Sequence, residues 1–536
     1  MDQNNKKDSF LKGALILGIA GLVVKVLGAF FRIPLGNFIG AEGMGYYQAA
    51  YPVYTLFLTL ATAGFPTALA KLVAEKIAID DYSGANKIFK VSYIILFITG
   101  FISFCIFLFG AEFIVNDVMH NPNAYYSMIA IAPSLLFVPV MAAYRGYFQG
   151  RREMKYIAVS QIVEQTFRVI VGLVLAYILM QKLGPKFGAA GAIVGATIGA
   201  FVSIGYLAIQ YMLNKKKLLN ENTNKKYDEE KISKILKQLL VVAIPITIGA
   251  SVMPLVNMVD NVVVIRQLEV AGFTNASANQ LFGQLTGMAM SIVNMPTIIT
   301  LSIGMSLVPA ISELTALKQT ERVKIEILTA VKVTLYILLP AAVGLAVLAT
   351  PIMKLLYSAE PASLGMIMLS LTPCVVFLGL MQTLNGILQG IGKPMVPVIG
   401  LLIGIVFKIG LTYTLTAMPE INIYGAAIGT VVAYLIAVVF ELWYIRKHVG
   451  VKFPIKDIFI KPISMVVIMG VVVKLSYVLL VGMIGGKLST VVSIGIGALI
   501  YLVVVFALGG ITKDELIKLP KGEKVYKLLN KIKIMK

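Results

Sequence analysis

Long apolar runs recur along the whole chain and are separated by short polar segments. A bilayer core about 30 Å thick needs roughly 20 apolar residues of helix, and fourteen such runs can be placed in the sequence. The pattern therefore predicts an all-α polytopic membrane protein with about fourteen transmembrane helices. The predicted spans are 11–33, 46–70, 91–111, 124–144, 156–181, 187–213, 238–265, 281–311, 327–350, 363–390, 394–418, 422–445, 457–482 and 488–510.

The amino-acid composition agrees with a membrane protein. Of the 536 residues, 58% are hydrophobic and 14% are charged, whereas soluble proteins have roughly 45–50% apolar and about 25% charged residues. The mean hydropathy is +0.87. These values exclude an ordinary soluble enzyme, a disordered chain and a collagen-like chain. The first span is too long for a cleavable signal peptide and lacks a small-residue cleavage site.

Lysine and arginine gather in alternate loops. If both termini lie on one side, that side carries 36 of the 47 Lys and Arg residues, and the opposite side carries five. Because cytoplasmic loops carry the excess of these residues, we expect an even number of spans and cytoplasmic termini. The same placement explains the net charge of +21 without nucleic acid. The basic loop 214–237 and the basic tail are topology signals beside anionic lipid.

Short sequence matches relate the two halves of the chain. GYFQG at 146–150 and GILQG at 386–390 match at a shift of 240, and GAIVGA at 191–196 and GAAIGT at 425–430 match at a shift of 234. Each half holds six spans, an even number, so the pseudo-repeat is parallel, as in transport folds whose substrate site lies between repeats. Glycines four residues apart in these matches indicate close helix packing, not a site.

This repeat predicts the domain organisation. Two six-helix lobes are joined by a basic linker, and two additional helices and a basic tail follow them. The boundaries are 1–213 for the N-lobe, 214–237 for the cytoplasmic linker, 238–447 for the C-lobe, 448–510 for spans 13 and 14, and 511–536 for the cytoplasmic tail.

The residues needed for catalysis are scarce. The chain has two cysteines, both in apolar runs, and two histidines, His120 in an outer loop and His448 beside the membrane. These numbers argue against a disulfide framework, a Cys-rich zinc site or a Ser-His-Asp set. There is no phosphate-binding loop and no H-E-x-x-H motif. We therefore expect a carrier or channel and no enzyme, with no catalytic residue, cofactor or metal site.

Charges inside the spans are the candidate functional residues. A charge at mid-helix costs roughly 2.5–3.5 kcal/mol on insertion scales, so several of them indicate an aqueous cavity or mutual pairing. Lys25 and Arg32 are seven residues apart and share one helix face. The repeat carries Arg168 onto Lys408 and Arg32 onto Arg266. We predict a central cavity ringed by cations and suited to a phosphate or pyrophosphate; its substrate-binding residues are Lys25, Arg32, Arg168, Arg266 and Lys408.

Other interpretations of these charges stay open. Glu164 and Arg168 are four residues apart and could neutralise each other. Arg266 could mark the outer interface. Asp260 could be a counter-ion for Arg266, and Glu164 or Asp260 could be a coupling-ion site. The two other membrane lysines are expected to snorkel or to have a structural role: Lys332 and Lys474.

Four segments resemble a known family. They are LVVKVLGAFFRIPLGNFIGAEGMGYYQAAYPVY, TAGFPTALAKLVAE, YRGYFQGRREMKYIAVSQIVEQTFRV and NMPTIITLSIGMSLVPAISEL. In these segments the chain is similar to the SpoVB/YtgP branch of the MOP exporter superfamily, which includes the MurJ-type lipid II flippases. The resemblance covers about residues 10–510. It implies two six-helix lobes in a V, with two extra C-terminal helices that form a lipid-tail groove.

The resemblance also implies a function. It implies export of an undecaprenyl-pyrophosphate-linked saccharide for peptidoglycan, cell-wall or polysaccharide synthesis across the bacterial cytoplasmic membrane. Lys25 and Arg32 match the two basic residues of helix 1 in MurJ-type proteins. The essential arginines of helices 2 and 8 have no counterpart, since span 2 has no cation before Lys71 and 281–311 has none. The pyrophosphate clamp would instead use Arg168, Arg266 and Lys408.

We therefore expect a monomeric flippase that works by alternating access. Its partners would be a lipid-linked saccharide, with lipid II favoured over another oligosaccharide, membrane lipids and a monovalent ion. Each charge that crosses 100 mV gains roughly 2.3 kcal/mol, so the membrane potential can drive the export of an anion. A multidrug or cation antiporter would need an acidic cavity, and a non-transporting scaffold for wall-synthesis enzymes would have no use for buried charges. Both alternatives are kept as rivals.

Overall fold

The computed structural model describes residues 3–219, 231–361, 363–454 and 456–510, which fold into helices and turns with no strand among them. These residues include thirteen helices long and apolar enough to cross a membrane. The difference from the predicted fourteen has one cause, because Ile16–Ala78 counts as one stretch although it holds the second predicted span and most of the first. The predicted all-α membrane fold is confirmed.

Helix α1 (Gln3–Thr62) is a hairpin of two helical arms. Its backbone breaks at Gly40, where φ is 65° and ψ is 179°, a conformation that is essentially restricted to glycine. The rings of Phe31 and Tyr47 lie 6.5 Å apart, although 16 residues of straight helix would separate them by roughly 24 Å. The chain therefore reverses at Gly40, and each arm corresponds to one of the first two predicted spans.

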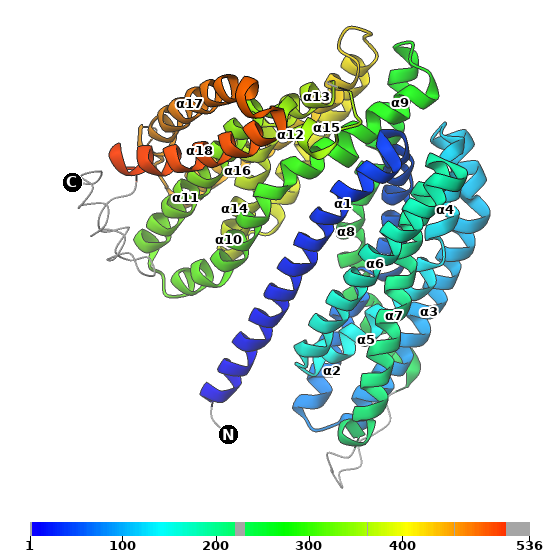
Figure 1. Cartoon of the computed structure of the whole chain (residues 1–536). Helices are drawn as coiled ribbons and strands as arrows, with labels where there is room; N and C mark the ends of the chain where they lie inside the picture. The colour runs from blue at the N-terminus through cyan, green and yellow to red at the C-terminus, as the bar shows by residue number, and fades with distance from the viewer. Residues whose placement is uncertain (1–2, 220–230, 362, 455, 511–536) are drawn as a thin grey trace. The chain divides into compact units, whose positions relative to one another are not determined.

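Packing divides the chain into two units, Met1–Met288 and Ala289–Lys536. In the first unit, α3, α5, α6 and α7 run side by side (Figure 1). After α1, the helices of this unit are α2 (Phe65–Ala78), α3 (Tyr82–Phe113), α4 (Tyr125–Ile131), α5 (Ser134–Gly150), α6 (Met154–Leu183), α7 (Pro185–Leu219), α8 (Ile232–Val270) and α9 (Asn275–Phe282).

Helices α8 and α9 pack against α1 within this unit. The side-chain nitrogen of Asn261 on α8 donates to the carbonyl oxygen of Ala49 at 2.9 Å, and this bond is buried. The side-chain nitrogen of Asn279 on α9 donates to the carbonyl oxygen of Glu42, also at 2.9 Å. The packing boundary thus follows α9, whereas the sequence assigned 238–265 to the second lobe. The lobe boundaries themselves stay a prediction.

The second unit is built around α14, which packs against α10, α11 and α16. Its core contains Ile327, Leu335, Leu384 and Ile387, all of them buried. Short α12 and α13 precede α14, and α17 and α18 pack against each other (Figure 1). The helices of this unit are α10 (Met290–Ala316), α11 (Thr320–Val347), α12 (Ala349–Leu356), α13 (Ser363–Leu371), α14 (Pro373–Gly390), α15 (Met395–Thr416), α16 (Ile423–Val449), α17 (Lys461–Ile484) and α18 (Gly486–Ala507).

Equivalent glycine contacts in the two units support the internal repeat. A Cβ on Gly195 of α7 would lie 2.5 Å from the carbonyl oxygen of Arg168 on α6. A Cβ on Gly429 of α16 would lie 3.1 Å from the carbonyl oxygen of Lys408 on α15. These four residues are the ones that the sequence repeat pairs. The glycines therefore have the packing role predicted for them, because small residues let helix backbones approach closely.

Helix boundaries at two prolines follow the predicted breaks. Helix α6 ends at Leu183, and α7 begins at Pro185 after Gly184, whose φ is 88°. Helix α15 begins directly after Pro394. Proline has no backbone N–H and is therefore suited to a helix start. These breaks give separate helices where the apolar pattern alone runs on.

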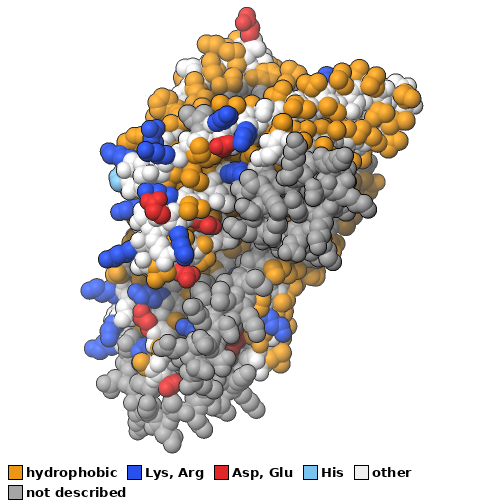
Figure 2. Space-filling model, turned by 90° about the vertical axis from the view of Figure 1, so that its left-hand side faces the viewer, with side chains coloured by type: hydrophobic (Ala, Val, Ile, Leu, Met, Phe, Trp, Pro, Cys, Tyr) orange, Lys and Arg blue, Asp and Glu red, His pale blue; other side chains and the backbone are white. Residues whose placement is uncertain are grey.

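Large apolar side chains are exposed on the outer faces of the spanning helices. Phe109 on α3 is 82% exposed and Met483 on α17 is 79% exposed. Figure 2 shows one face of the molecule, on which hydrophobic side chains cover wide areas while Lys and Arg gather along one margin. In water such a surface would promote aggregation, so it fits lipid contact, and the chain is a multi-pass membrane protein.

Candidate functional site

The first arm of α1 presents its predicted cations toward α6. Lys25 is exposed and Arg32 is half-buried, and Gly28 lies between them on the same face. A Cβ on Gly28 would come within 3.3 Å of the side-chain nitrogen of Gln165 on α6. The face that bears Lys25 and Arg32 is therefore directed toward the turn of α6 that also carries Glu164.

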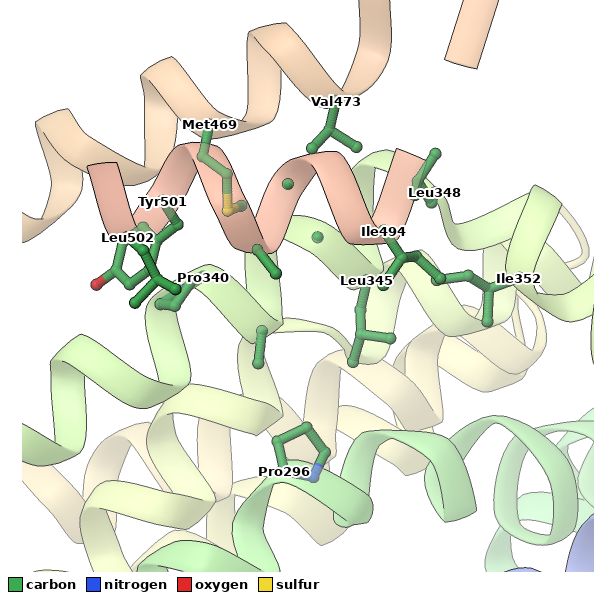
Figure 3. Close-up of a pocket in the computed structure, with 14 residues that line it drawn as sticks. Pro296, Pro340, Leu345, Leu348, Ile352, Met469, Val473, Ile494, Tyr501 and Leu502 are labelled. Carbon is green, nitrogen blue, oxygen red and sulfur yellow. The ribbon is translucent and has the colours of Figure 1, made fainter. Parts of the chain in front are cut away.

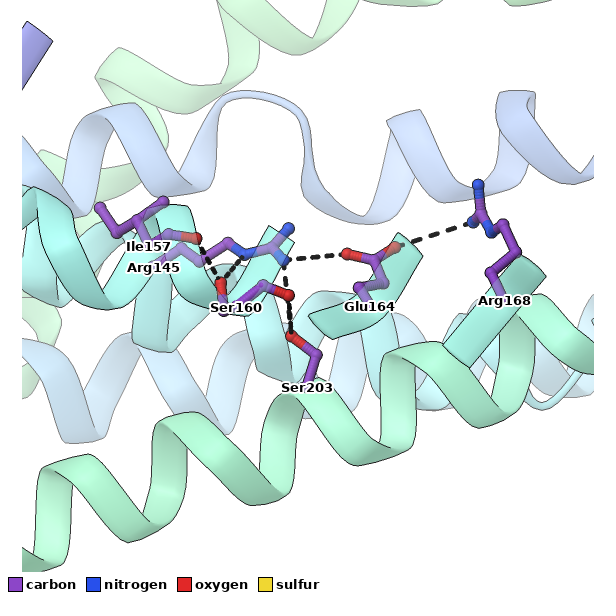
Figure 4. A network of polar contacts seen from close by, with 6 residues as sticks. All are labelled: Arg145, Ile157, Ser160, Glu164, Arg168 and Ser203. Atoms are coloured by element: carbon purple, nitrogen blue, oxygen red, sulfur yellow. Dashed lines mark hydrogen bonds and ion pairs between the residues drawn. The ribbon is translucent and has the colours of Figure 1, made fainter. Parts of the chain in front are cut away.

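An arginine–glutamate–arginine network lies beside this face (Figure 4). Nη2 of Arg145 on α5 is 2.9 Å from Oε2 of Glu164, and Nη2 of Arg168 is 3.7 Å from Oε1 of the same carboxylate. The three side chains are only 17–21% exposed. One carboxylate thus faces two guanidinium groups, and the network carries a net positive charge.

Serine hydroxyls fix the Arg145 end of the network. Nε of Arg145 donates to Oγ of Ser160 at 2.9 Å, and Nη2 also reaches Oγ of Ser203 on α7 at 3.5 Å. Oγ of Ser203 donates to the carbonyl oxygen of Ser160 at 3.0 Å. Three helices therefore hold one guanidinium group, an arrangement that limits its movement within the membrane-spanning part of the chain.

A tyrosine row on the second arm of α1 joins the network to Arg32. Nη1 of Arg168 donates to Oη of Tyr51 at 3.3 Å. The rings of Tyr47 and Tyr51 stack with centroids 5.8 Å apart, and those of Tyr51 and Tyr54 are 5.9 Å apart. Tyr47 lies within electrostatic range of both Arg32 and Arg168. The first unit thus brings these two predicted site residues together around Tyr47.

The other predicted site residues are not joined to this network by any interaction described for them. Arg266 is exposed near the end of α8, and Asp260 is half-buried on the same helix. Lys408 is half-buried on α15 of the second unit. Glu164 lies between two arginines, a position suited to a counter-ion. The assignment of all these residues to a substrate cavity or an ion site stays a prediction.

Arg145 is a member of the network that the sequence analysis missed. The predicted span ended at residue 144, so Arg145 was counted among the loop cations. The structure corrects this, because α5 continues to Gly150. The signal was present in the sequence, since Gly146 and Gly150 are four residues apart, as in the other helix-packing glycine pairs.

An apolar cavity of about 480 Å³ lies in the second unit (Figure 3). Its lining comes from α10, α11, α12, α17 and α18 and is apolar except for Tyr501. Oη of Tyr501 donates to the carbonyl oxygen of Tyr336 at 2.8 Å, which satisfies this one polar group. The labelled lining residues in Figure 3 include Pro296, Pro340, Leu345, Met469, Val473 and Ile494.

No metal site is evident in the part of the chain that the structure describes. Across residues 3–219, 231–361, 363–454 and 456–510, no group of three or more His, Cys, Asp and Glu side chains is placed to hold a metal ion. Two features described above are suited to ligand binding: the cationic network suits an anion, and the apolar cavity suits a hydrocarbon chain.

Cations between spanning helices and an apolar cavity are features suited to a membrane transport protein. The sequence matches the family described as polysaccharide biosynthesis protein over residues 10–315, more than half of the chain, and the chain belongs to that family. The MatE family also matches, over residues 245–414.

Two relatives from Bacillus subtilis (strain 168) align over nearly the whole chain. Stage V sporulation protein B is 29% identical, over 96% of this chain and 98% of that protein. Lipid II flippase MurJ is 27% identical, over 94% of this chain and 96% of that protein. The predicted resemblance to the MOP exporter superfamily is confirmed. One relative is named as a flippase, in agreement with the prediction that the chain is not an enzyme.

Solved structures share the fold. Lipid II flippase MurJ in an inward closed conformation aligns with a TM-score of 0.69 and 19% identity, over 94% of this chain and all of that chain. An inward-facing multidrug resistance MATE family transporter of the MOP superfamily aligns with a TM-score of 0.64 and 16% identity, over 80% of this chain and 94% of that chain. At these identities the likeness concerns the fold alone.

Proposed function

We propose that the protein is a flippase for an undecaprenyl-pyrophosphate-linked saccharide in a bacterial cytoplasmic membrane, with both termini in the cytoplasm. The observation that carries this proposal is the excess of positive charge inside the membrane-spanning part of the first unit. Two arginines face one carboxylate there, and Lys25 and Arg32 lie on the adjacent face of α1. An anion that enters this region is attracted by the net positive charge of the Arg145–Glu164–Arg168 network.

The pyrophosphate headgroup would bind at Arg32 and Arg168. Guanidinium groups bind phosphate oxygens in a bidentate manner. Tyr51 already accepts a hydrogen bond from Arg168, and its hydroxyl could turn to donate to an anion instead. Arg145 is held by Ser160 and Glu164, so we assign it the role of positioning Glu164, and not of binding the substrate.

The polyprenyl tail would occupy the apolar cavity between α11, α12, α17 and α18. Its lining offers hydrocarbon contact with one polar group already satisfied. If the tail stays outside the headgroup site, the long apolar chain does not have to pass charged residues. Placing hydrocarbon against a charged group that has lost its water costs free energy. The proposal thus separates headgroup and tail between the two kinds of surface that the chain offers.

The membrane potential would bias this transport. A headgroup with two charges gains about 4–5 kcal/mol on moving outward across 100 mV, inside negative. This energy favours export without nucleotide hydrolysis, and the sequence has no phosphate-binding loop for a nucleotide. The excess of positive charge also argues against the alternative function, a multidrug or cation antiporter, because the arginines would repel a cationic substrate.

Lipid II is the proposed cargo, and another lipid-linked oligosaccharide is the alternative. The second cargo is favoured by the similarity to stage V sporulation protein B, which is slightly higher than the similarity to MurJ. A bacterium whose own lipid II flippase can be shut off separates the two. The readout is the amount of lipid II that becomes exposed on the outer leaflet, at matched membrane levels of each variant.

We expect the wild type to restore exposure and Arg32→Ala and Arg168→Ala to lose most of it. Lys182→Ala is the matched control, because Lys182 is an exposed cation on α6. Full activity of both arginine variants would contradict the assignment of the headgroup to Arg32 and Arg168. If the wild type reaches the membrane but restores no lipid II exposure, the result would point to another polyprenyl-linked glycan as the cargo. The same exposure assay, followed by lipid extraction, tests those glycans.

A further inference from the structure

Glu441 is a carboxylic acid in the core of the second unit. It lies on α16 and is 0% exposed. Both of its carboxyl oxygens are buried and neither has a hydrogen-bond partner among the described residues. The candidate site described above does not use this residue, and no ion pair of the described residues includes it. A titratable group of this kind requires a physical explanation.

The residues one turn from Glu441 on α16 are apolar. Ala437 and Val438, one turn before it on α16, and Ile445, one turn after it, are buried members of the hydrophobic core. Helices α13, α14 and α15 pack against α16. Helix α13 has no titratable side chain, and α14 has only Cys374.

Helix α15 brings only one charged side chain, Lys408, which is far from Glu441. Lys408 packs against Gly429, and Gly429 precedes Glu441 by 12 residues, or roughly 18 Å along the helix. The only other titratable side chain of α15 is Tyr413. Among the described residues of α13, α14 and α15, none therefore supplies a cation at the level of Glu441.

The internal repeat shows that this position belongs to an apolar core. The shift of 234 that pairs Gly195 with Gly429 places Glu441 on Leu207 of α7. Leu207 is 0% exposed and packs with Met141 and Phe148 in the core of the first unit. The counterparts of these two residues, at the shift of 240, are Met381 and Leu388, which are core residues of the second unit. Glu441 thus occupies a leucine position.

A polar pocket lies at the basic end of α16. It has a volume of about 230 Å³, and Tyr444 and His448, one and two turns beyond Glu441, line it. Lys318 and Lys393 line it from the ends of α10 and α14. On α11, Lys324 is paired with Glu321 at 2.8 Å. The charged residues that line the pocket itself are therefore lysines, with His448 beside them, and Ile445, one turn beyond Glu441 on α16, is buried.

A carboxylate charge without a partner in such surroundings is far more costly than the neutral acid. We propose that Glu441 is a proton-binding site of the transport cycle. It holds a proton in the arrangement seen here, and it releases that proton from its carboxyl oxygen to water in the pocket when α14 and α16 move apart. The charge that forms would then be stabilised by Lys318 and Lys393. The coupling to transport rests on the proposed flippase function, whereas the bound proton does not.

Infrared spectroscopy tests the bound proton without any cargo. The full chain in a maltoside detergent, which has no ester carbonyl, is measured at neutral pH. We expect the carbonyl stretch of a protonated carboxylic acid in the wild type, its loss in Glu441→Gln, and its retention in Glu313→Gln, since Glu313 is exposed on α10. Glu441→Leu, which restores the repeat residue, should fold at least as stably and also lack the band. A band unchanged in Glu441→Gln and Glu441→Leu would overturn the proposal.

Proteoliposomes that contain an undecaprenyl-pyrophosphate-linked saccharide test the coupling. With the membrane potential clamped, the wild-type flipping rate should change several-fold with the direction of a pH gradient, and the rate of Glu441→Gln should not respond. An equal response of both proteins would overturn the coupling. If the wild type flips no such lipid, the proposed function fails, while the infrared result still decides whether Glu441 binds a proton.

Discussion

Arg145 and Glu164 form the shorter ion pair of the membrane network, with 2.9 Å between Nη2 and Oε2. The pair joins α5 to α6, whereas the i,i+4 pair of Glu164 with Arg168 on α6 itself is 3.7 Å long. Because the closer partner comes from another helix, Glu164 helps to fix α5 relative to α6. This also leaves Arg168 less tightly held and able to face an anion.

Glu164→Gln should destabilise the first unit. The substitution leaves two arginines without a counter-ion, and removal of one partner of a buried ion pair costs about 3 kcal/mol or more. Since the side chains are 17–21% exposed, we expect the lower end of that range. The measurement is the apparent thermal unfolding midpoint in detergent. Glu313→Gln, at an exposed site, should leave the midpoint unchanged, and equal midpoints for both variants would contradict the role of Glu164.

Gly195→Ala should loosen the packing of α6 against α7. A Cβ at Gly195 would lie 2.5 Å from the carbonyl oxygen of Arg168, so the helices must separate, at a cost of about 1–3 kcal/mol. Gly205→Ala on the same helix meets nothing within 4 Å and should be neutral or slightly stabilising. The same thermal assay distinguishes them, and a Gly195→Ala protein as stable as Gly205→Ala would show that the helices adjust freely.

Gly40→Ala should disturb the hairpin of α1. At φ 65° and ψ 179° an alanine is strained by about 1–3 kcal/mol. Gly21→Ala, at an open position in the first arm, should stabilise by about 0.5–1 kcal/mol. Cysteines introduced at positions 31 and 47 would report how close the two arms of α1 lie, through the yield of cross-linking between them. This yield should fall when Gly40→Ala is added and should not fall when Gly21→Ala is added. An unchanged yield and midpoint would mean that the turn tolerates a side chain.

Gly344→Leu should block the apolar cavity of the second unit. Gly344 lines the cavity, and a Cβ there meets nothing within 4 Å, so the leucine side chain can fill the space without displacing the backbone. We expect loss of photo-crosslinking to a polyprenyl probe and at least tenfold slower transport, with the unfolding midpoint retained. Gly482→Leu on α17, also at an open position, is the control. Unchanged crosslinking in Gly344→Leu would contradict the assignment of the polyprenyl tail to this cavity.

The sequence predicted the membrane-spanning helices because hydropathy is a local property. Each of the fourteen apolar runs corresponds to a helical segment, and the breaks at Pro185 and Pro394 follow from the missing N–H of proline. The tight reversal between the first two spans could not be foreseen, because it depends on the backbone angles of Gly40. The glycine pattern of the repeat could also be recognised in the sequence, because close helix packing requires small residues at a fixed spacing.

What the sequence by itself determined was therefore the set of spanning helices, their repeat and the presence of several cations among them. Only the tertiary structure decided the partners of those cations. Arg145 meets Glu164 and Arg168 meets Tyr51 because of how α1, α5 and α6 are rotated and how deep each lies. The burial of Glu441 was decided in the same way. Rotation and depth arise from packing between residues far apart in sequence, and a local pattern of apolar and polar positions does not contain that information.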